Sequence, residues 1–190
     1  NRKYGFSAEM SLNLIQGLYE KKLTTYPRVD TQYLSDDIYP KCPGILNGVS
    51  QYAEAGKKPY LEMIKNLASI SKTLPKTNRV FDTSKVTDHH AIIPTGQVPT
   101  GLTDVEKKVY DLIARRFIAV FYPDCKFSTT TVMGKVDKVE FKASGKEILS
   151  QGWRAVYGKD EITDSSAKNA AADKILPSFV KGETGPHKPT

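Results

Sequence analysis

The stretch TDVEKKVYDLIARRFIAVF, residues 103–121, predicts the clearest helix of the chain. Thr103 and Glu106 stand three apart, the spacing of a capping box, in which two side chains satisfy backbone amides at the start of a helix. Tyr122 and Pro123 end the pattern. We therefore expect a helix over residues 104–121 with one apolar face, because these residues recur with a period near 3.6: Val105, Val109, Leu112, Ile113, Phe117 and Val120.

Helical periodicity also occurs upstream of this stretch. Ser7 is a favourable N-cap for a helix over residues 7–20. A second helix is expected over residues 58–74, ended by Pro75. Its buried stripe would be Tyr60, Met63, Ile64, Leu67 and Ile70. Asp30 is placed to cap a short helical turn over residues 31–36, while the prolines and glycine of residues 40–44 indicate a loop, as does the run 81–100.

Downstream, the period changes from 3.6 to two. Phe127, Thr129 and Thr131 alternate with polar residues, and a second alternating run holds Val139, Phe141 and Ala143. Residues 134–138 are the predicted connection. One or two more strands are expected around Ile148, Trp153, Val156 and Tyr157. Residues 159–174 are predicted to be a mobile loop and residues 182–190 a tail without order of its own.

The net charge and composition favour a protein that binds a polyanion. The 190 residues carry a formal net charge of +7 with a pI near 9.2, which suits a nucleic acid but is also common on ordinary basic surfaces. The two cysteines, Cys42 and Cys125, are far apart, so neither a zinc site nor a disulfide scaffold is expected. No apolar run approaches a membrane span, and the chain lacks an initiating Met, which hints at a longer parent.

Two short clusters have the residue types that phosphate chemistry needs. Tyr26 and Arg28 are two apart, so on extended backbone both side chains would point to the same side and could reach one phosphodiester. The second cluster is Asp88-His89-His90, where an imidazole could hold a phosphate oxygen or move a proton. Taken alone, each pattern is more often a packing tyrosine or a surface loop.

The surrounding residues change this balance. The run LYEKKLTTYPR, residues 18–28, resembles the active-site tyrosine motif of type IA DNA topoisomerases in its topoisomerase III form. The run DHHAIIPT, residues 88–95, resembles the histidine signature of the same family, in the same order and at similar spacing. The helix over 112–117 and the later Phe141 and Gly152-Trp153 also fit, so the resemblance covers most of the chain.

The resemblance implies a catalytic set of Tyr26 as nucleophile, Arg28 as the cation that positions the scissile phosphate and His89 as a phosphate contact. Arg28, Asp30 and His89 are the implied DNA-binding residues. His90 stands where some relatives carry Glu and is left out of the set, and Val29 departs from the Thr often found there. The implied reaction is a reversible transesterification through a 5′-phosphotyrosine, without ATP and without zinc in this part. Mg²⁺ would be bound by an acidic cluster in a domain absent from this chain.

The family resemblance also implies an α+β fold in two parts. Residues 1–126 would form a mainly helical, winged-helix-like (CAP-like) tyrosine domain, and residues 127–190 would supply antiparallel β strands of the gate or arch domain. The expected partners are single-stranded DNA and the rest of the parent chain, with no membrane. The expected location is the cytoplasm, on the nucleoid if the host is bacterial.

Three other functions are weighed against this reading. Tyrosine recombinases also form phosphotyrosine, but they carry the tyrosine after an arginine and a His-x-x-Arg element, whereas here it comes first. A single-stranded nucleic-acid-binding module without catalysis is the alternative, and the isolated fragment is itself expected to be inactive. A purely structural hinge protein would show no preference for single-stranded DNA.

Overall fold

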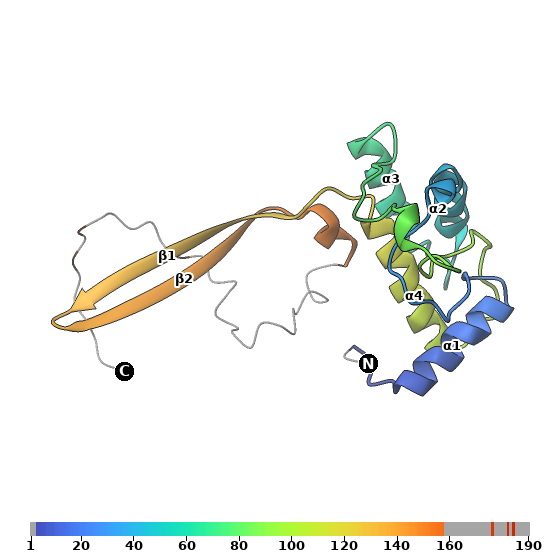
Figure 1. The fold of residues 1–190 in the computed structure, drawn as a ribbon, viewed down its shortest axis with the longest axis horizontal. Coiled ribbons are helices and arrows are strands. Elements are labelled where there is room, and N and C mark those ends of the chain that lie inside the picture. The colour runs from blue at the N-terminus through green and yellow to red at the C-terminus, as the bar shows by residue number, and fades with distance from the viewer. Residues whose placement is uncertain (1–2, 158–175, 177–181, 183, 185–190) are drawn as a thin grey trace. The chain divides into compact units, whose positions relative to one another are not determined.

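Four α-helices and one β-hairpin, joined by loops and short 3-10 helices, build the part of the chain that the structure describes (Figure 1). This computed structural model describes residues 3–157, 176, 182 and 184. The chain divides into two compact units, Asn1–Pro123 and Asp124–Thr190. The helices lie in the first unit and the hairpin in the second. The predicted α+β class is confirmed at this level.

The helices α1, Ala8–Glu20, and α4, Asp104–Ala119, pack against each other. Both begin as predicted: the Ser7 side chain accepts a hydrogen bond from the Met10 amide, and Thr103 and Glu106 form the reciprocal capping box. The buried face of α4 is broader than the predicted stripe. Leu112 is 37% exposed, while residues outside that stripe are buried: Tyr110, Ala114, Ile118 and Ala119.

Helix α2, Cys42–Gln51, lies where a loop was expected. Pro43 is at the start of this helix, where a missing amide proton costs nothing because no intrahelical acceptor exists for it. The predicted helical turn over residues 31–36 is also wrong. Leu34 instead donates its amide to the Val80 carbonyl at 2.8 Å and forms an isolated bridge with Phe81, and the 3-10 helix η1 begins only at Asp36, spanning Asp36–Lys41.

Helix α3, Leu61–Ile70, is shorter than the predicted range and ends five residues before Pro75. Its cap residue, Ser71, has extended backbone, so the break precedes the proline. Leu67 is buried as expected, but Ile70 is 52% exposed. Tyr60, at the start of the predicted stripe, is also buried, so the stripe is wrong only at its C-terminal end.

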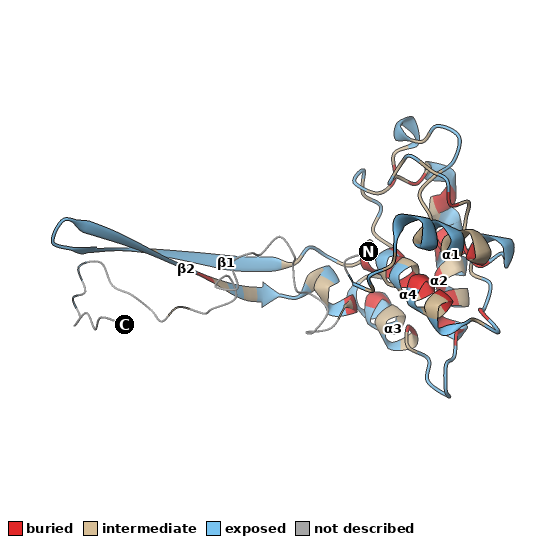
Figure 2. Cartoon of the chain, turned by 90° about the horizontal axis from the view of Figure 1, so that it is seen from below, coloured by how far each residue is buried: buried red, intermediate tan, exposed pale blue. Residues whose placement is uncertain are grey.

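The core of the first unit lies around α4 (Figure 2). Tyr60 and Tyr110 are each 1% exposed and pack with Tyr52 as a cluster of three rings. Phe121 is fully buried, with its ring centroid 5.3 Å from that of Phe117. Burying such large rings contributes roughly 1.5–3 kcal/mol each before conformational entropy is counted.

One backbone contact joins α2 to the segment that carries the histidine signature. A Cβ built on Gly48 would lie 1.8 Å from the carbonyl oxygen of Gly96. Gly96 itself has φ of +90°, a conformation that favours glycine. The two glycines therefore let helix and loop approach at a distance that no side chain at residue 48 permits.

The second unit is a long antiparallel hairpin of β1, Lys126–Val136, and β2, Val139–Ser150 (Figure 1). The predicted five-residue connection is wrong, since the strands run to a two-residue turn in which Asp137 has φ of +53°. Ile148 belongs to β2, and the 3-10 helix η3, Gly152–Val156, stands where further strands were expected. The extended backbone ends at Ser150, since Gln151 is already helical with φ of −62°, and Gly152 follows with φ of +50°.

Most hairpin residues are exposed on both faces, including Val136, Val139 and Phe141. The predicted loop over 159–174 lies outside the described residues, as does the tail apart from residues 182 and 184. No helix within the described residues combines the length and the apolar character required to cross a bilayer.

Candidate active site

The two signature segments lie side by side because their backbones are hydrogen-bonded together. The Thr25 amide donates to the Ile93 carbonyl at 2.9 Å, and the Ile93 amide donates to Thr25 Oγ1 at 3.0 Å. The Thr95 amide donates to the Leu23 carbonyl at 3.1 Å. Thr24 forms an isolated antiparallel bridge with Pro94. Residues about 70 apart in sequence are thereby fixed next to each other, immediately before Tyr26 and after His89.

The end of α1 directs the chain into this pairing. The Leu23 amide donates to the Leu18 carbonyl at 2.9 Å and the Lys22 amide to the Tyr19 carbonyl at 2.8 Å. This is the Schellman pattern, which requires a left-handed residue just after the helix. Lys22 takes that position with φ of +59°, although glycine is the usual residue there. The helix therefore stops sharply and the next residues run on as extended backbone.

Tyr26 is half-buried between two other rings. Its centroid lies 4.6 Å from that of His89, with the planes tilted by 43°, and 5.4 Å from that of Tyr19, in an edge-to-face arrangement at 81°. Within the described residues, the hydroxyl of Tyr26 has no hydrogen-bond partner. The contacts that orient this phenol are therefore ring contacts, and its oxygen is available for a ligand.

An open hollow of about 450 Å³ adjoins this ring row. Four of its lining residues can carry charge: Arg28, Asp30, Asp88 and His89, with Pro27, Val29 and Thr87 completing the wall. Thr87 donates a hydrogen bond to the Asp30 carboxylate at 3.3 Å, which ties the two sides of the hollow together. In the part of the chain that the structure describes, the exposed guanidinium of Arg28 has no ion-pair partner.

The structure brings all four predicted site residues to one place. Tyr26 touches His89, and Arg28, Asp30 and His89 line the same hollow. His90, which was left out of the catalytic set, has its Nδ1 2.8 Å from the Ala91 carbonyl oxygen. Their roles in chemistry stay predictions.

Tyr19 was not predicted as a site residue. Its place in the last turn of the predicted first helix, seven residues before Tyr26, was the available signal.

Three other groups of the first unit that could act as nucleophiles are more deeply buried than Tyr26. Desolvation raises the pKa of the Tyr60 hydroxyl, reinforced by the Asp111 carboxylate, and burial likewise raises the pKa of the Tyr110 hydroxyl. Burial also raises the pKa of the Cys42 thiol to about 11. Because only the deprotonated form of each group is a strong nucleophile, these three residues are poor candidates.

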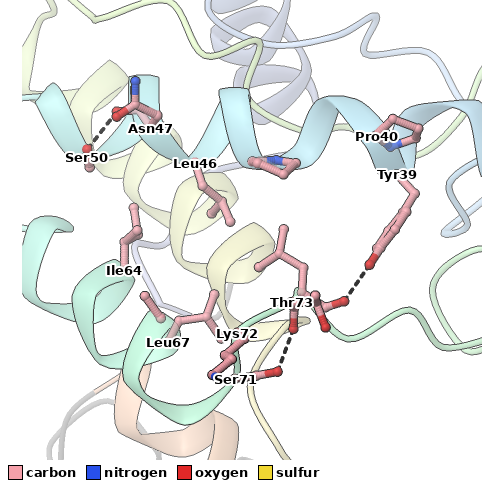
Figure 3. A pocket seen from close by; sticks show the side chains of 13 residues that line it. Tyr39, Pro40, Leu46, Asn47, Ser50, Ile64, Leu67, Ser71, Lys72 and Thr73 are labelled. Atoms are coloured by element: carbon pink, nitrogen blue, oxygen red, sulfur yellow. Dashed lines mark hydrogen bonds between the residues drawn. The ribbon is translucent and has the colours of Figure 1, made fainter.

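A second hollow, of about 470 Å³, lies between α2, α3 and the chain after α3 (Figure 3). Leu46, Ile64 and Leu67 give it an apolar wall, and the Tyr39 hydroxyl at its edge donates to the Leu74 carbonyl at 2.6 Å. Among its described lining residues, Lys72 is the one that carries a charge. This apolar groove therefore lacks the grouped acid, base and cation of the polar hollow.

Comparison with known proteins agrees with the two signatures. A profile of the DNA topoisomerase family matches residues 1–189, and the chain belongs to this family. Relatives named DNA topoisomerase 3 are similar along 97% of the chain: that of Bacillus subtilis (strain 168) is 40% identical over 188 residues, and that of Bacillus licheniformis is 41% identical over 189. The chain spans 24% of the length of each of these relatives. The family resemblance drawn from the sequence is confirmed.

Proposed function

We propose that this chain is the tyrosine-bearing part of a type IA DNA topoisomerase, and that Tyr26 cleaves and rejoins one DNA strand. The observation that carries the proposal is the contact between the Tyr26 and His89 rings beside a hollow lined by Arg28. The sequence predicted these three residues as catalytic, and the contact between Tyr26 and His89, which are 63 residues apart, supports that prediction. The family membership supports the same chemistry.

The proposed step is a transesterification at phosphorus. The Tyr26 oxygen loses its proton and forms a bond to the phosphorus, while the bond from phosphorus to the 3′ oxygen breaks and that oxygen leaves with a proton. The strand end is then held as a 5′-phosphotyrosine, and the reverse reaction restores the strand without ATP. Such reactions depend on positioning and on neutralising charge at the phosphate. Arg28 would supply that charge through two parallel hydrogen bonds, and His89 would contact a phosphate oxygen.

Mg²⁺ is proposed to act from elsewhere in the parent protein. Among the described residues no group of three or more His, Cys, Asp or Glu side chains could hold a metal ion. Asp30 and Asp88 both line the hollow, but they do not form such a group. A bound Mg²⁺ would help neutralise charge at the phosphate, and it would be held by an acidic cluster outside this chain.

The finer structural predictions belong to the same proposal. Residues 1–126 are proposed to be the winged-helix-like tyrosine domain, and residues 127–190 part of the gate. The exposed hairpin supports the second assignment, since an isolated two-stranded sheet has too little buried surface to be stable alone. Single-stranded DNA as substrate and a cytoplasmic location stay predictions. For the isolated chain, the alternative is a DNA-binding module without catalysis, which the net charge of +7 favours.

The test is Tyr26→Phe in the full-length parent protein, with single-stranded DNA and Mg²⁺. We expect the protein–DNA adduct seen after denaturation to disappear, because only the hydroxyl can form the covalent link. Affinity for single-stranded DNA should stay within about twofold, since the ring and the hollow are retained. Cleavage by the variant within tenfold of wild type would contradict the assignment.

A further inference from the structure

We propose that Tyr19 is a positioning residue, which holds the ring of Tyr26 against His89 so that the phenol oxygen faces the scissile phosphate. The proposal rests on the function proposed above. The three rings form a row, with centroids 5.4 Å apart from Tyr19 to Tyr26 and 4.6 Å apart from Tyr26 to His89. Tyr26 therefore contacts one aromatic ring from α1 and one from the histidine segment, and we call these two rings its aromatic walls.

The ring of Tyr26 needs such walls because hydrogen bonds do not fix it. Within the described residues its hydroxyl has no partner. A half-buried tyrosine held by nothing else can change its side-chain rotamer, and each change moves the phenol oxygen by several ångströms. An error of about 1 Å in the position of a reacting atom can lower the rate a hundredfold. A ring that excludes unproductive rotamers of Tyr26 therefore affects the rate of cleavage more than the stability of the fold.

Tyr19 is itself on a rigid support. It lies in the last turn of α1, and its carbonyl accepts the Lys22 amide in the bond that closes the helix. The next residue, Lys21, forms an ion pair of 2.6 Å with Glu106, the capping residue of α4. The hydrogen bond from the Lys21 ammonium is the main reason that the pKa of the Glu106 carboxyl is lowered. The ring of Tyr19 is therefore carried by a segment that is fixed to both α1 and α4.

The exposure of Tyr19 argues against a purely structural role. Tyr19 is 39% exposed, so the packing of the core depends little on its ring. An edge-to-face pair of this kind contributes about 0.5–1.5 kcal/mol beyond burial, and half-exposed residues of a helix usually tolerate truncation. We therefore expect removal of the ring to change the rate of cleavage more than the stability of the fold.

The experiment compares Tyr19→Ala, Tyr19→Phe and the control Leu12→Ala in the full-length parent protein. Leu12 is 38% exposed on the same helix, so it matches Tyr19 in burial. We measure the single-turnover rate of Tyr26 adduct formation at saturating single-stranded DNA, the dissociation constant, and the midpoint of thermal unfolding. Tyr19→Ala should lower the rate about tenfold with affinity within about twofold, while Tyr19→Phe and Leu12→Ala should match wild type.

Two results would overturn the proposal. One is a rate for Tyr19→Ala equal to that of Leu12→Ala. The other is a loss of affinity with an unchanged rate in the bound complex, which would assign Tyr19 to stacking on a nucleobase instead. If Tyr19→Phe keeps the wild-type rate and both Tyr19 variants unfold at the same temperature, the slow cleavage of Tyr19→Ala results from lost positioning and not from a damaged fold. If the wild-type protein forms no adduct on Tyr26, the proposed function fails; if it does and Tyr19→Ala has no effect, only this inference fails.

Discussion

The polar hollow beside Tyr26 and the apolar groove between α2 and α3 have nearly the same volume, about 450 and 470 Å³, but opposite linings. The first gathers a guanidinium, an imidazole and two carboxylates from two segments far apart in sequence. The second is lined by aliphatic and proline side chains, by polar side chains without charge and by one charged residue, Lys72. The volumes of the two hollows therefore do not show which one is the candidate site. What marks the candidate site is an imidazole and, among the described residues, an arginine without an ion-pair partner, both beside an available phenol.

The two hollows also depend on different parts of the fold. The groove is formed by helices that pack side by side, so its lining follows from helical periodicity. The polar hollow is formed by loops whose backbones are pinned by Thr25, Ile93 and Thr95. Loops held by a rigid scaffold can present charged groups that helices would leave in solvent. The difference between the two hollows can be tested by substituting comparable residues in each of them.

After the loss of the Tyr26 hydroxyl itself, the largest effect is expected for Arg28→Ala in the full-length protein. Cleavage should fall by about 10²–10³, the loss typical of one charge-stabilising group, while affinity changes by much less. Arg28→Lys should recover only part of the rate, because an ammonium cannot make the paired hydrogen bonds. The control is Lys72→Ala in the apolar groove, which removes the same charge. Equal rates for the two alanine variants, measured in single turnover, would remove the distinction between the hollows.

A smaller effect is expected for His89→Ala. Its rate of cleavage should fall by roughly ten- to a thousandfold, since both the proposed phosphate contact and the ring contact with Tyr26 are lost. His90→Ala is the matched control, because that imidazole faces the Ala91 carbonyl instead. The measurement is single-turnover cleavage between pH 6 and 9. Rates for His89→Ala that coincide with wild type over this range would make the histidine segment structural only.

Gly48→Ala tests the contact that joins the two regions, since α2 lines the groove on one side and meets Gly96 on the other. A methyl group would lie 1.8 Å from the Gly96 carbonyl oxygen, so helix or loop must shift. We expect a loss of about 1–3 kcal/mol in unfolding free energy, with slower cleavage. Gly44→Ala, on the same helix and with nothing within 4 Å of its added Cβ, should leave both unchanged. Chemical denaturation measures the unfolding free energy of both variants, and equal values would contradict a close contact between Gly48 and Gly96.

The smallest effect concerns Lys22 at the end of α1. Glycine adopts φ of +59° without the steric cost that a side chain pays, so Lys22→Gly should raise the unfolding free energy by about 1 kcal/mol relative to Lys22→Ala. The alanine variant lacks the amine but keeps the Cβ, so it isolates the backbone term. Thermal unfolding of the two proteins measures the difference. A glycine variant no more stable than the alanine variant would mean that the turn carries no strain.

The sequence predicted those parts of the fold that periodicity and capping determine. Helices α1 and α4 begin at the predicted caps, and the change of period at residue 126 marks the hairpin. Helix α2 was missed because Pro43 and Gly44 are also typical of loops, and only the packing of Leu46 and Val49 makes a helix favourable there. The turn of the hairpin was misplaced because Gly134 suggested an earlier break than Asp137 makes.

The sequence predicted the residues of the candidate site, whose roles stay predictions, but it did not predict their arrangement. Tyr26, Arg28 and His89 came from short motifs, and no local pattern states that two such motifs meet in space. Their meeting depends on hydrogen bonds such as that between Thr25 and Ile93, which belong to the tertiary fold. The contact of Tyr19 with Tyr26 was missed for the same reason: Tyr19 lies within the run LYEKKLTTYPR, but that run does not show that the two rings meet.

The central claim is that Tyr26 is the nucleophile, and mapping the covalent adduct tests it most directly. The full-length protein is incubated with single-stranded DNA and Mg²⁺, denatured and digested with protease and nuclease, and the modified peptide is identified by mass spectrometry. We predict a nucleotide joined through its 5′ phosphate to Tyr26. A nucleotide on another residue, above all on the neighbouring and exposed Tyr19, or linkage through a 3′ phosphate, would contradict the account.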